Sequence, residues 1–235
     1  GENLTKNWSV AEMINSFTTN LAITGWVFGE TPNAPTATAA FGTPEYTYSS
    51  SIDGAYSSDV PTEAGTYYVK ATVTGTENYA ELVSEAVEFV IGQKVLYADN
   101  INTIADVVYT GEEIRPVIEV MDGNTVLVLD TDYEVDYQNN INAGSAEAIV
   151  TFKGNYKGQA KREFTILPKP INTEIPLTAP ASNAAPQTKI ETDEYTATVV
   201  WSPEVTDKFA YSTAYTATIT ITPKENYAVT GVLEN

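Results

Sequence analysis

The sequence predicts an all-β protein made of tandem β-sandwich modules in an elongated array. Three observations support this: segments of the chain recur in the same order, apolar and polar residues alternate inside each copy, and Gly, Pro, Asn and Asp interrupt the chain every ten residues or so. A chain of 235 residues, 43% of them hydrophobic, can bury more than one core. The pattern therefore indicates several small antiparallel sandwiches.

The internal repeat sets the module boundaries. Residues 64–91 match residues 143–166, and a partial third copy covers 215–227. In each copy an alternating strand is followed by an Asn-Tyr pair, at Asn78-Tyr79, Asn155-Tyr156 and Asn226-Tyr227. Order is preserved throughout, as duplicated structural units require. We therefore predict modules at 1–92, 93–167 and 168–235, and we expect the third to lack strands at its C-terminal end.

The alternation gives each copy an inward face. The expected inward residues are Tyr67, Val69, Ala71 and Val73, then Ala146, Ala148, Val150 and Phe152, then Tyr215, Ala217, Ile219 and Ile221. Helix is nearly absent from the prediction. The one candidate is a turn at 9–14, where Ser9 could cap and Glu12 follows three positions later. Pro168 and Pro170 are expected to stiffen the joint before the third module.

Composition excludes several classes of function. There are 12 basic and 31 acidic side chains, so the net charge is 12 − 31 = −19. Such a surface repels phosphate backbones, and we expect no nucleic-acid partner. The chain has no His and no Cys, which removes the common metal ligands, thiol nucleophiles and disulfides. No uncharged apolar run is long enough to span a bilayer, so no membrane insertion is expected.

The middle of the chain resembles a known repeat family. The residues that carry the resemblance are Tyr109-Thr110-Gly111-Glu112, Asp132 to Asn140, Ala143-Gly144, Lys153 to Gly158, and Phe164-Thr165-Ile166. Together they are similar to the bacterial immunoglobulin-like repeats of Gram-positive surface and secreted proteins. Residues 24–91 resemble a sister repeat, although Phe28-Gly29 lacks the additional Thr found in Tyr109-Thr110-Gly111. Residues 195–203 resemble repeats found beside them.

The resemblance implies immunoglobulin-like sandwiches that serve as a stalk or adhesion module, without shared catalytic residues. We therefore expect a non-enzymatic, monomeric, extracellular segment of a bacterial cell-surface or secreted protein that needs no cofactor. The alternative is an adhesin whose modules themselves bind a host or cell-wall glycan or protein.

The densest acidic cluster is the main candidate metal site. It consists of Asp130, Asp132, Glu134 and Asp136. If the segment is extended, alternate spacing puts all four carboxylates on one face, where calcium would suit the oxygens. The twelve-residue calcium loop with its central glycine is missing, and a charged strand edge would give the same sequence. Glu191, Asp193 and Glu194 form a second, weaker cluster.

Aromatic residues are the candidate ligand-binding groups. Trp8, Trp26 and Trp201 and the 15 tyrosines could stack on sugar rings, but we expect Trp26 and Trp201 to pack in cores. The tyrosines nearer the expected solvent-facing register are Tyr46, Tyr48, Tyr56 and Tyr68, so a glycan would bind there. The recurring tyrosines of the Asn-Tyr pairs are expected to plug the sandwich corners. Lys70 and Lys153 are expected on polar faces, which disfavours a buried cross-link from either lysine.

Overall fold

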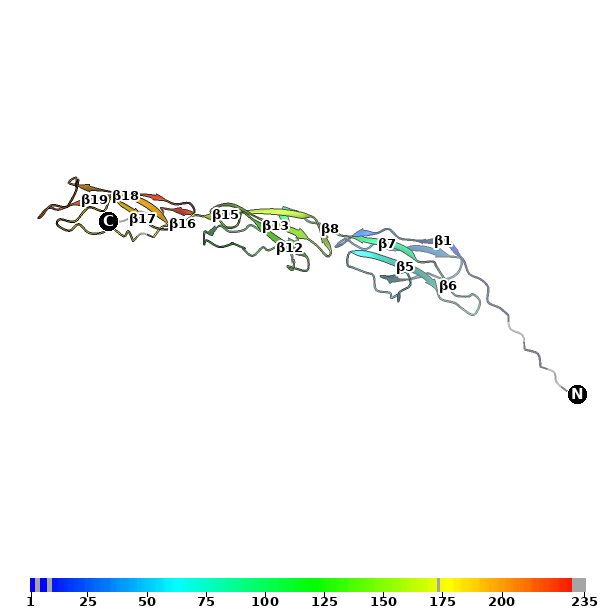
Figure 1. Ribbon diagram of the computed structural model, residues 1–235. Helices are drawn as coiled ribbons and strands as arrows, with labels where there is room; N and C mark the ends of the chain where they lie inside the picture. Colours follow the sequence, from blue (N-terminus) through cyan, green and yellow to red (C-terminus); the bar gives the residue numbers. More distant parts are fainter. Residues whose placement is uncertain (3–4, 8–9, 173, 230–235) are drawn as a thin grey trace. The chain divides into compact units, whose positions relative to one another are not determined.

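The computed structural model describes residues 1–229 apart from 3, 4, 8, 9 and 173 (Figure 1). Within this part the secondary structure is almost wholly β, and the one helical element is the short 3-10 helix η1, Ala98–Asn100. This confirms the predicted all-β class. In the same part of the chain, no helix is long and apolar enough to cross a membrane.

The predicted helical turn at 9–14 is wrong over its described residues. Ser9 and Trp8 lie outside the described residues, and residues 10–14 form no helix. Met13 instead pairs in parallel with Tyr79: the Met13 N–H donates to the Asn78 carbonyl at 2.8 Å, and the Ala80 N–H donates to the Met13 carbonyl at 3.0 Å. This pairing uses the backbone groups that a helical turn would need.

The first predicted module contains two sheets. One is an antiparallel pair, β1 (Phe17–Ala22) with β3 (Thr36–Ala39). The other has the order β2-β7-β5-β4, with β6 also paired to β5. Its strands are β2 (Trp26–Val27), β4 (Glu45–Ser49), β5 (Gly65–Val73), β6 (Leu82–Val83) and β7 (Val87–Gly92), and Figure 1 labels β5, β6 and β7.

The core of this module follows the predicted alternation. Val69 and Ala71 on β5 are fully buried, and Tyr67 packs against the same cluster. Phe89 on β7 lies at its centre, with ring centroids 5.3 Å from Trp26, 6.1 Å from Tyr48 and 5.9 Å from Tyr67. The expectation that Trp26 serves the core is confirmed, since it is 7% exposed.

The second predicted module is built on a four-stranded sheet with the order β12-β13-β15-β9. Its strands are β9 (Val107–Val108), β12 (Tyr133–Gln138), β13 (Gly144–Phe152) and β15 (Gln159–Leu167). Two short pairs accompany it: β10 (Met121–Asp122) with β11 (Thr125–Val126), and β8 (Lys94–Val95) with β14 (Tyr156–Lys157). The four predicted inward residues of β13 are all buried.

The third predicted module has a three-stranded antiparallel sheet, β17 (Lys189–Glu191), β18 (Tyr195–Ser202) and β19 (Thr216–Pro223). A short parallel pair joins β16 (Lys169–Pro170) to β20 (Tyr227–Ala228). Alternate residues of β18 are buried, and Trp201 is 6% exposed in contact with Phe209, as expected of a core tryptophan. The predicted inward residues of β19 pack against this core.

The chain divides into two compact units, each with more contacts inside it than to the other. The first comprises Gly1–Asn100, Val120–Glu134 and Thr151–Ala160, and the second comprises Ile101–Glu119, Val135–Val150 and Lys161–Asn235. The division passes through β12, β13 and β15 rather than through 92 and 167. Three clusters of buried side chains each lie within one predicted module, and the module boundaries stay a prediction.

Replacing Phe89 by Ala is expected to lower the free energy of unfolding of the first module by about 3–5 kcal/mol, because it leaves a cavity among three aromatic rings. Urea unfolding followed by near-ultraviolet circular dichroism measures the change. Val90→Ala, at the adjacent and half-exposed position, is the matched control and should change stability by less than about 0.5 kcal/mol. Equal effects of the two substitutions would contradict the assignment of Phe89 to the core.

Candidate functional site

The four tyrosines proposed as a glycan surface fall on two faces of one sheet. Tyr46 and Tyr48 on β4 pair with Ala71 and Val69 on β5, and directly opposed residues share a face. Tyr48 is 7% exposed in the core and Tyr46 packs against it. The expectation that these two face solvent is therefore wrong, because the register of β4 against β5 turns them inward.

The other two predicted tyrosines lie on the outer face. The Tyr68 hydroxyl donates to Glu88 Oε2 at 3.0 Å, and this hydrogen bond raises the pKa of Tyr68. The Tyr56 ring lies beneath Lys70, whose Nζ is 4.5 Å from the ring centroid, and its hydroxyl donates to the Ile52 carbonyl. Two half-buried rings and a cation thus remain available on this face as groups that could stack on a ligand.

The predicted acidic cluster is split between a turn and a strand. Glu134 and Asp136 alternate on the exposed face of β12, as predicted, and Glu134 pairs with Lys153 at 2.5 Å. Asp130 and Asp132 precede the strand in a turn where Asp130 has a φ of 66°. The expectation of one extended face is therefore wrong for these two residues.

Asp132 has a structural contact of its own. Its Oδ2 accepts the Val128 N–H at 2.8 Å, which closes the turn before β12. In the described part of the chain, no three His, Cys, Asp or Glu side chains form a group that could hold a metal ion. The structure therefore adds nothing to the calcium prediction.

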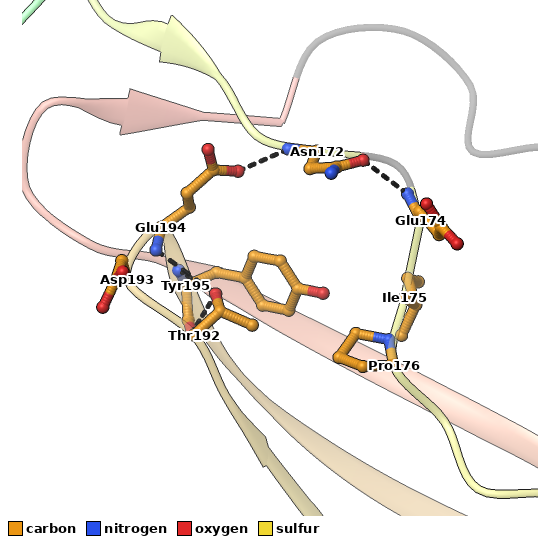
Figure 2. A pocket seen from close by; sticks show the side chains of 8 residues that line it. All are labelled: Asn172, Glu174, Ile175, Pro176, Thr192, Asp193, Glu194 and Tyr195. Atoms are coloured by element: carbon orange, nitrogen blue, oxygen red, sulfur yellow. Dashed lines mark hydrogen bonds between the residues drawn. The ribbon is translucent and has the colours of Figure 1, made fainter.

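A pocket of about 400 Å³ lies beside the second acidic cluster, around the start of β18 (Figure 2). Its walls carry Glu174, Asp193 and Glu194, and the Tyr195 ring extends across it toward Ile175. The Tyr195 side chain is 1% exposed, and its hydroxyl has no hydrogen-bond partner among the described residues.

The polar groups of this pocket mainly hold its loops together. Glu194 Oε2 accepts the Asn172 N–H at 2.5 Å, and Asn172 Oδ1 accepts the Glu174 N–H at 2.9 Å (Figure 2). Thr192 Oγ1 accepts the N–H groups of Glu194 and Tyr195, at 3.2 and 3.0 Å. Such side-chain contacts to the backbone are typical of turns. The arrangement explains the loop conformation without a ligand.

The Asn-Tyr pair at 155–156 forms a contact that the sequence did not predict. Within the first unit, Asn155 Oδ1 accepts the Ala64 N–H at 2.9 Å, and Asn155 Nδ2 donates to Glu63 Oε2. The Tyr156 ring meets Phe28 edge to face, with centroids 5.4 Å apart. Residues of the second predicted module therefore contact the first predicted module at the Ala64-Gly65 hairpin.

The Asn-Tyr pair at 226–227 repeats this geometry within the second unit. Asn226 Oδ1 accepts the Ala143 N–H at 2.7 Å, and Asn226 Nδ2 donates to Asn142 Oδ1 at 3.3 Å. The Tyr227 ring meets Tyr109 edge to face at 5.8 Å. We call this arrangement the junction: an Asn-Tyr corner that holds the alanine-glycine hairpin of the preceding module.

The backbone is also the same in the two junctions. The Lys94 N–H donates to the Asn155 carbonyl at 3.0 Å, and the Lys169 N–H donates to the Asn226 carbonyl at 2.8 Å. These bonds align β8 with β14 and β16 with β20, both in parallel. The expectation that the recurring tyrosines plug a corner was incomplete, because Tyr156 and Tyr227 each also contact an aromatic ring of the preceding module, whereas Tyr79 stacks on Phe41 of its own module.

Carboxylates surround Tyr156 in the first junction. The ring is 5% exposed, and Asp122, which also accepts a hydrogen bond from Lys94 Nζ at 2.6 Å, lies close to it. Burial first, and then the charges of Asp122, Asp132 and Glu63, raise the pKa of Tyr156 to about 12. The neutral hydroxyl is therefore strongly favoured in the folded protein.

Comparison with known protein families, with characterised proteins and with solved structures finds no match to this chain. Its function is therefore argued from the sequence and the geometry.

The raised pKa of Tyr156 predicts a loss of stability at high pH. The pKa of an unfolded tyrosine is about 10, so between pH 10 and pH 12 the unfolded chain releases this proton first. The stabilisation is complete below pH 10 and is lost as the pH rises through 12. Urea unfolding across this range should show a steeper loss for the wild type than for Tyr156→Phe. Replacing the exposed Tyr211 by Phe is the control and should leave the wild-type slope unchanged; identical slopes for all three proteins would refute the prediction.

Proposed function

We propose that this chain is a non-catalytic spacer of a bacterial surface protein, in which immunoglobulin-like β-sandwich repeats follow one another end to end. Such a spacer holds a distal part of the protein away from the cell. The observation that carries the proposal is the junction, because the same corner holds the same hairpin at Asn155 and at Asn226. A chain that repeats its junctions as well as its modules is suited to a structural role.

The chemistry of the junction supports this role. One Asn side chain donates and accepts at once, so it positions a hairpin with two hydrogen bonds, each stabilising by about 1 kcal/mol. The neighbouring edge-to-face rings add about 0.5–1.5 kcal/mol beyond the area that they bury. A net charge of −19 keeps neighbouring copies of such a spacer apart on a surface.

A second candidate function is binding of a glycan or a host protein. It is favoured by the outer face of the five-stranded sheet, where Tyr56, Tyr68 and Lys70 lie together. Flat rings beside a cation suit a sugar ring with a polar rim. The spacer is preferred, because the hydrogen bonds of Tyr56 and Tyr68 are already made within the chain.

Small-angle X-ray scattering tests the spacer. The doubly substituted protein Asn155→Ala/Asn226→Ala should give a broader distribution of interatomic distances than the wild type, since both hairpins lose their hydrogen bonds. Circular dichroism should be unchanged, because neither residue lies within a sheet core. Asn20→Ala, at an exposed position of β1, is the control. Identical scattering from the double variant and the wild type would contradict the role given to the junctions.

A glycan array separates the two functions. The spacer predicts no reproducible binding. Reproducible binding that is lost in Tyr56→Ala/Tyr68→Ala would favour the binding function, and Tyr211→Ala, at an exposed tyrosine in the turn before β19, is the matched control.

A further inference from the structure

The first module carries a third corner with the backbone of a junction. The Asn78 carbonyl accepts the Met13 N–H at 2.8 Å, as the Asn155 and Asn226 carbonyls accept those of Lys94 and Lys169. Met13 pairs in parallel with Tyr79, as Lys94 pairs with Tyr156. The corner at Asn78-Tyr79 is therefore formed in the same way as the two that hold a hairpin.

This third corner has no hairpin among the described residues. The side chain of Asn78 makes no hydrogen bond within them and is exposed, whereas Asn155 and Asn226 are half-buried by the hairpins they hold. Met13, beside the corner, is 54% exposed and leaves apolar surface there. The Tyr79 ring is stacked on Phe41 of its own module, with centroids 3.9 Å apart, so the open part of this corner consists of the Asn78 side chain and Met13.

The third module carries the complementary half of a junction. The spacing from Ala143 to Asn155 is 155 − 143 = 12 residues, and that from Ala214 to Asn226 is 226 − 214 = 12. Ala143 lies directly before β13 and Ala214 lies two residues before β19. The match is to the second module, because in the first module the spacing from Ala64 to Asn78 is 78 − 64 = 14. Ala64 and Ala143 are half-buried in junctions, but Ala214 is exposed and its N–H has no partner within the described residues.

The groups around Ala214 match those that a corner holds. Thr213 precedes it, in the place of Glu63 and Asn142, and its Oγ1 can accept a hydrogen bond while donating to the Tyr211 carbonyl at 3.1 Å. Tyr211 is 74% exposed and offers an aromatic face close to the turn. The acceptor and the N–H donor of a junction are thus both present on the surface, and Tyr211 adds an exposed ring close to them.

The geometry points to a head-to-tail contact between two copies of this chain, in which the Asn78-Tyr79 corner of one copy binds the Thr213-Ala214 turn of another. Asn78 Oδ1 accepts the Ala214 N–H, and Asn78 Nδ2 donates to Thr213 Oγ1. The contact joins two different surfaces, so it extends into a line of copies instead of closing a dimer. The inference rests on the proposed function, because it extends the same junction beyond one chain.

Charge determines how the contact has to be tested. Each copy carries −19, so two free copies repel each other. Fusing two whole copies in series offsets this repulsion. The fusion raises the effective concentration of the Thr213-Ala214 turn of the first copy near the Asn78-Tyr79 corner of the second. The chain has no cysteine, so an introduced pair contains the only thiols.

The experiment uses this fusion with Thr213→Cys in the first copy and Asn78→Cys in the second. Under mild oxidation we expect the disulfide to form about tenfold faster than in a control pair, Asp207→Cys with Asn78→Cys. Asp207 is exposed and close in sequence to the turn, but it does not align with Ala143. Peptide mapping identifies the linked residues. The single-chain pair Asn142→Cys with Asn226→Cys shows the rate in a formed junction.

A second variant removes the backbone N–H donor and leaves the introduced thiols in place. Adding Ala214→Pro to the first copy eliminates the N–H that Asn78 accepts and should reduce the linking rate to that of the control pair. Equal rates in the target and control pairs overturn the proposal, and so does a rate unaffected by Ala214→Pro. Neither result alters the scattering or glycan tests of the single chain, so failure of this contact and failure of the spacer are distinguishable.

Discussion

The alternation of buried and exposed residues along the long strands is the constraint on which the rest of this protein depends. In β5 and β13, every second side chain is buried, so each strand has a fixed inner face and a fixed length. Where such a strand begins, the chain turns through an alanine-glycine hairpin, and shortly after it ends the chain passes through an Asn-Tyr corner. Each junction therefore joins the start of one long strand to the corner after the next: Ala64 before β5 to Asn155 after β13, and Ala143 before β13 to Asn226 after β19.

The junction shows how a small polar contact can become specific. Asn is suited to the corner because its side chain carries both a donor and an acceptor, and a backbone N–H with a neighbouring oxygen is what a hairpin presents. A backbone hydrogen bond from the N–H of Lys94 or Lys169 to the Asn carbonyl also holds the corner in place. The tyrosine then excludes water from one side, which strengthens the hydrogen bonds beside it.

Much of the fold could be predicted from the residues, but the candidate sites could not. The alternation of apolar and polar residues along β5 predicted its buried face correctly, because this alternation is a local property of one strand. The face of Tyr46 and Tyr48 depended on how β4 lies against β5, and a register is a contact between strands distant in sequence. For Asp130, a positive φ interrupted the extended chain that the acidic spacing assumed.

The sequence by itself determined that this chain is all-β, which residues of its long strands face inward, and that Asn and Tyr recur in phase with the repeat. Each of these follows from local spacing, because a strand's side chains alternate whatever surrounds it. The tertiary structure alone decided that the recurring Asn holds a hairpin and that Tyr156 lies among carboxylates. The two hairpin contacts join residues 91 and 83 positions apart, and the carboxylates near Tyr156 come from three separate parts of the chain, so both features depend on folding.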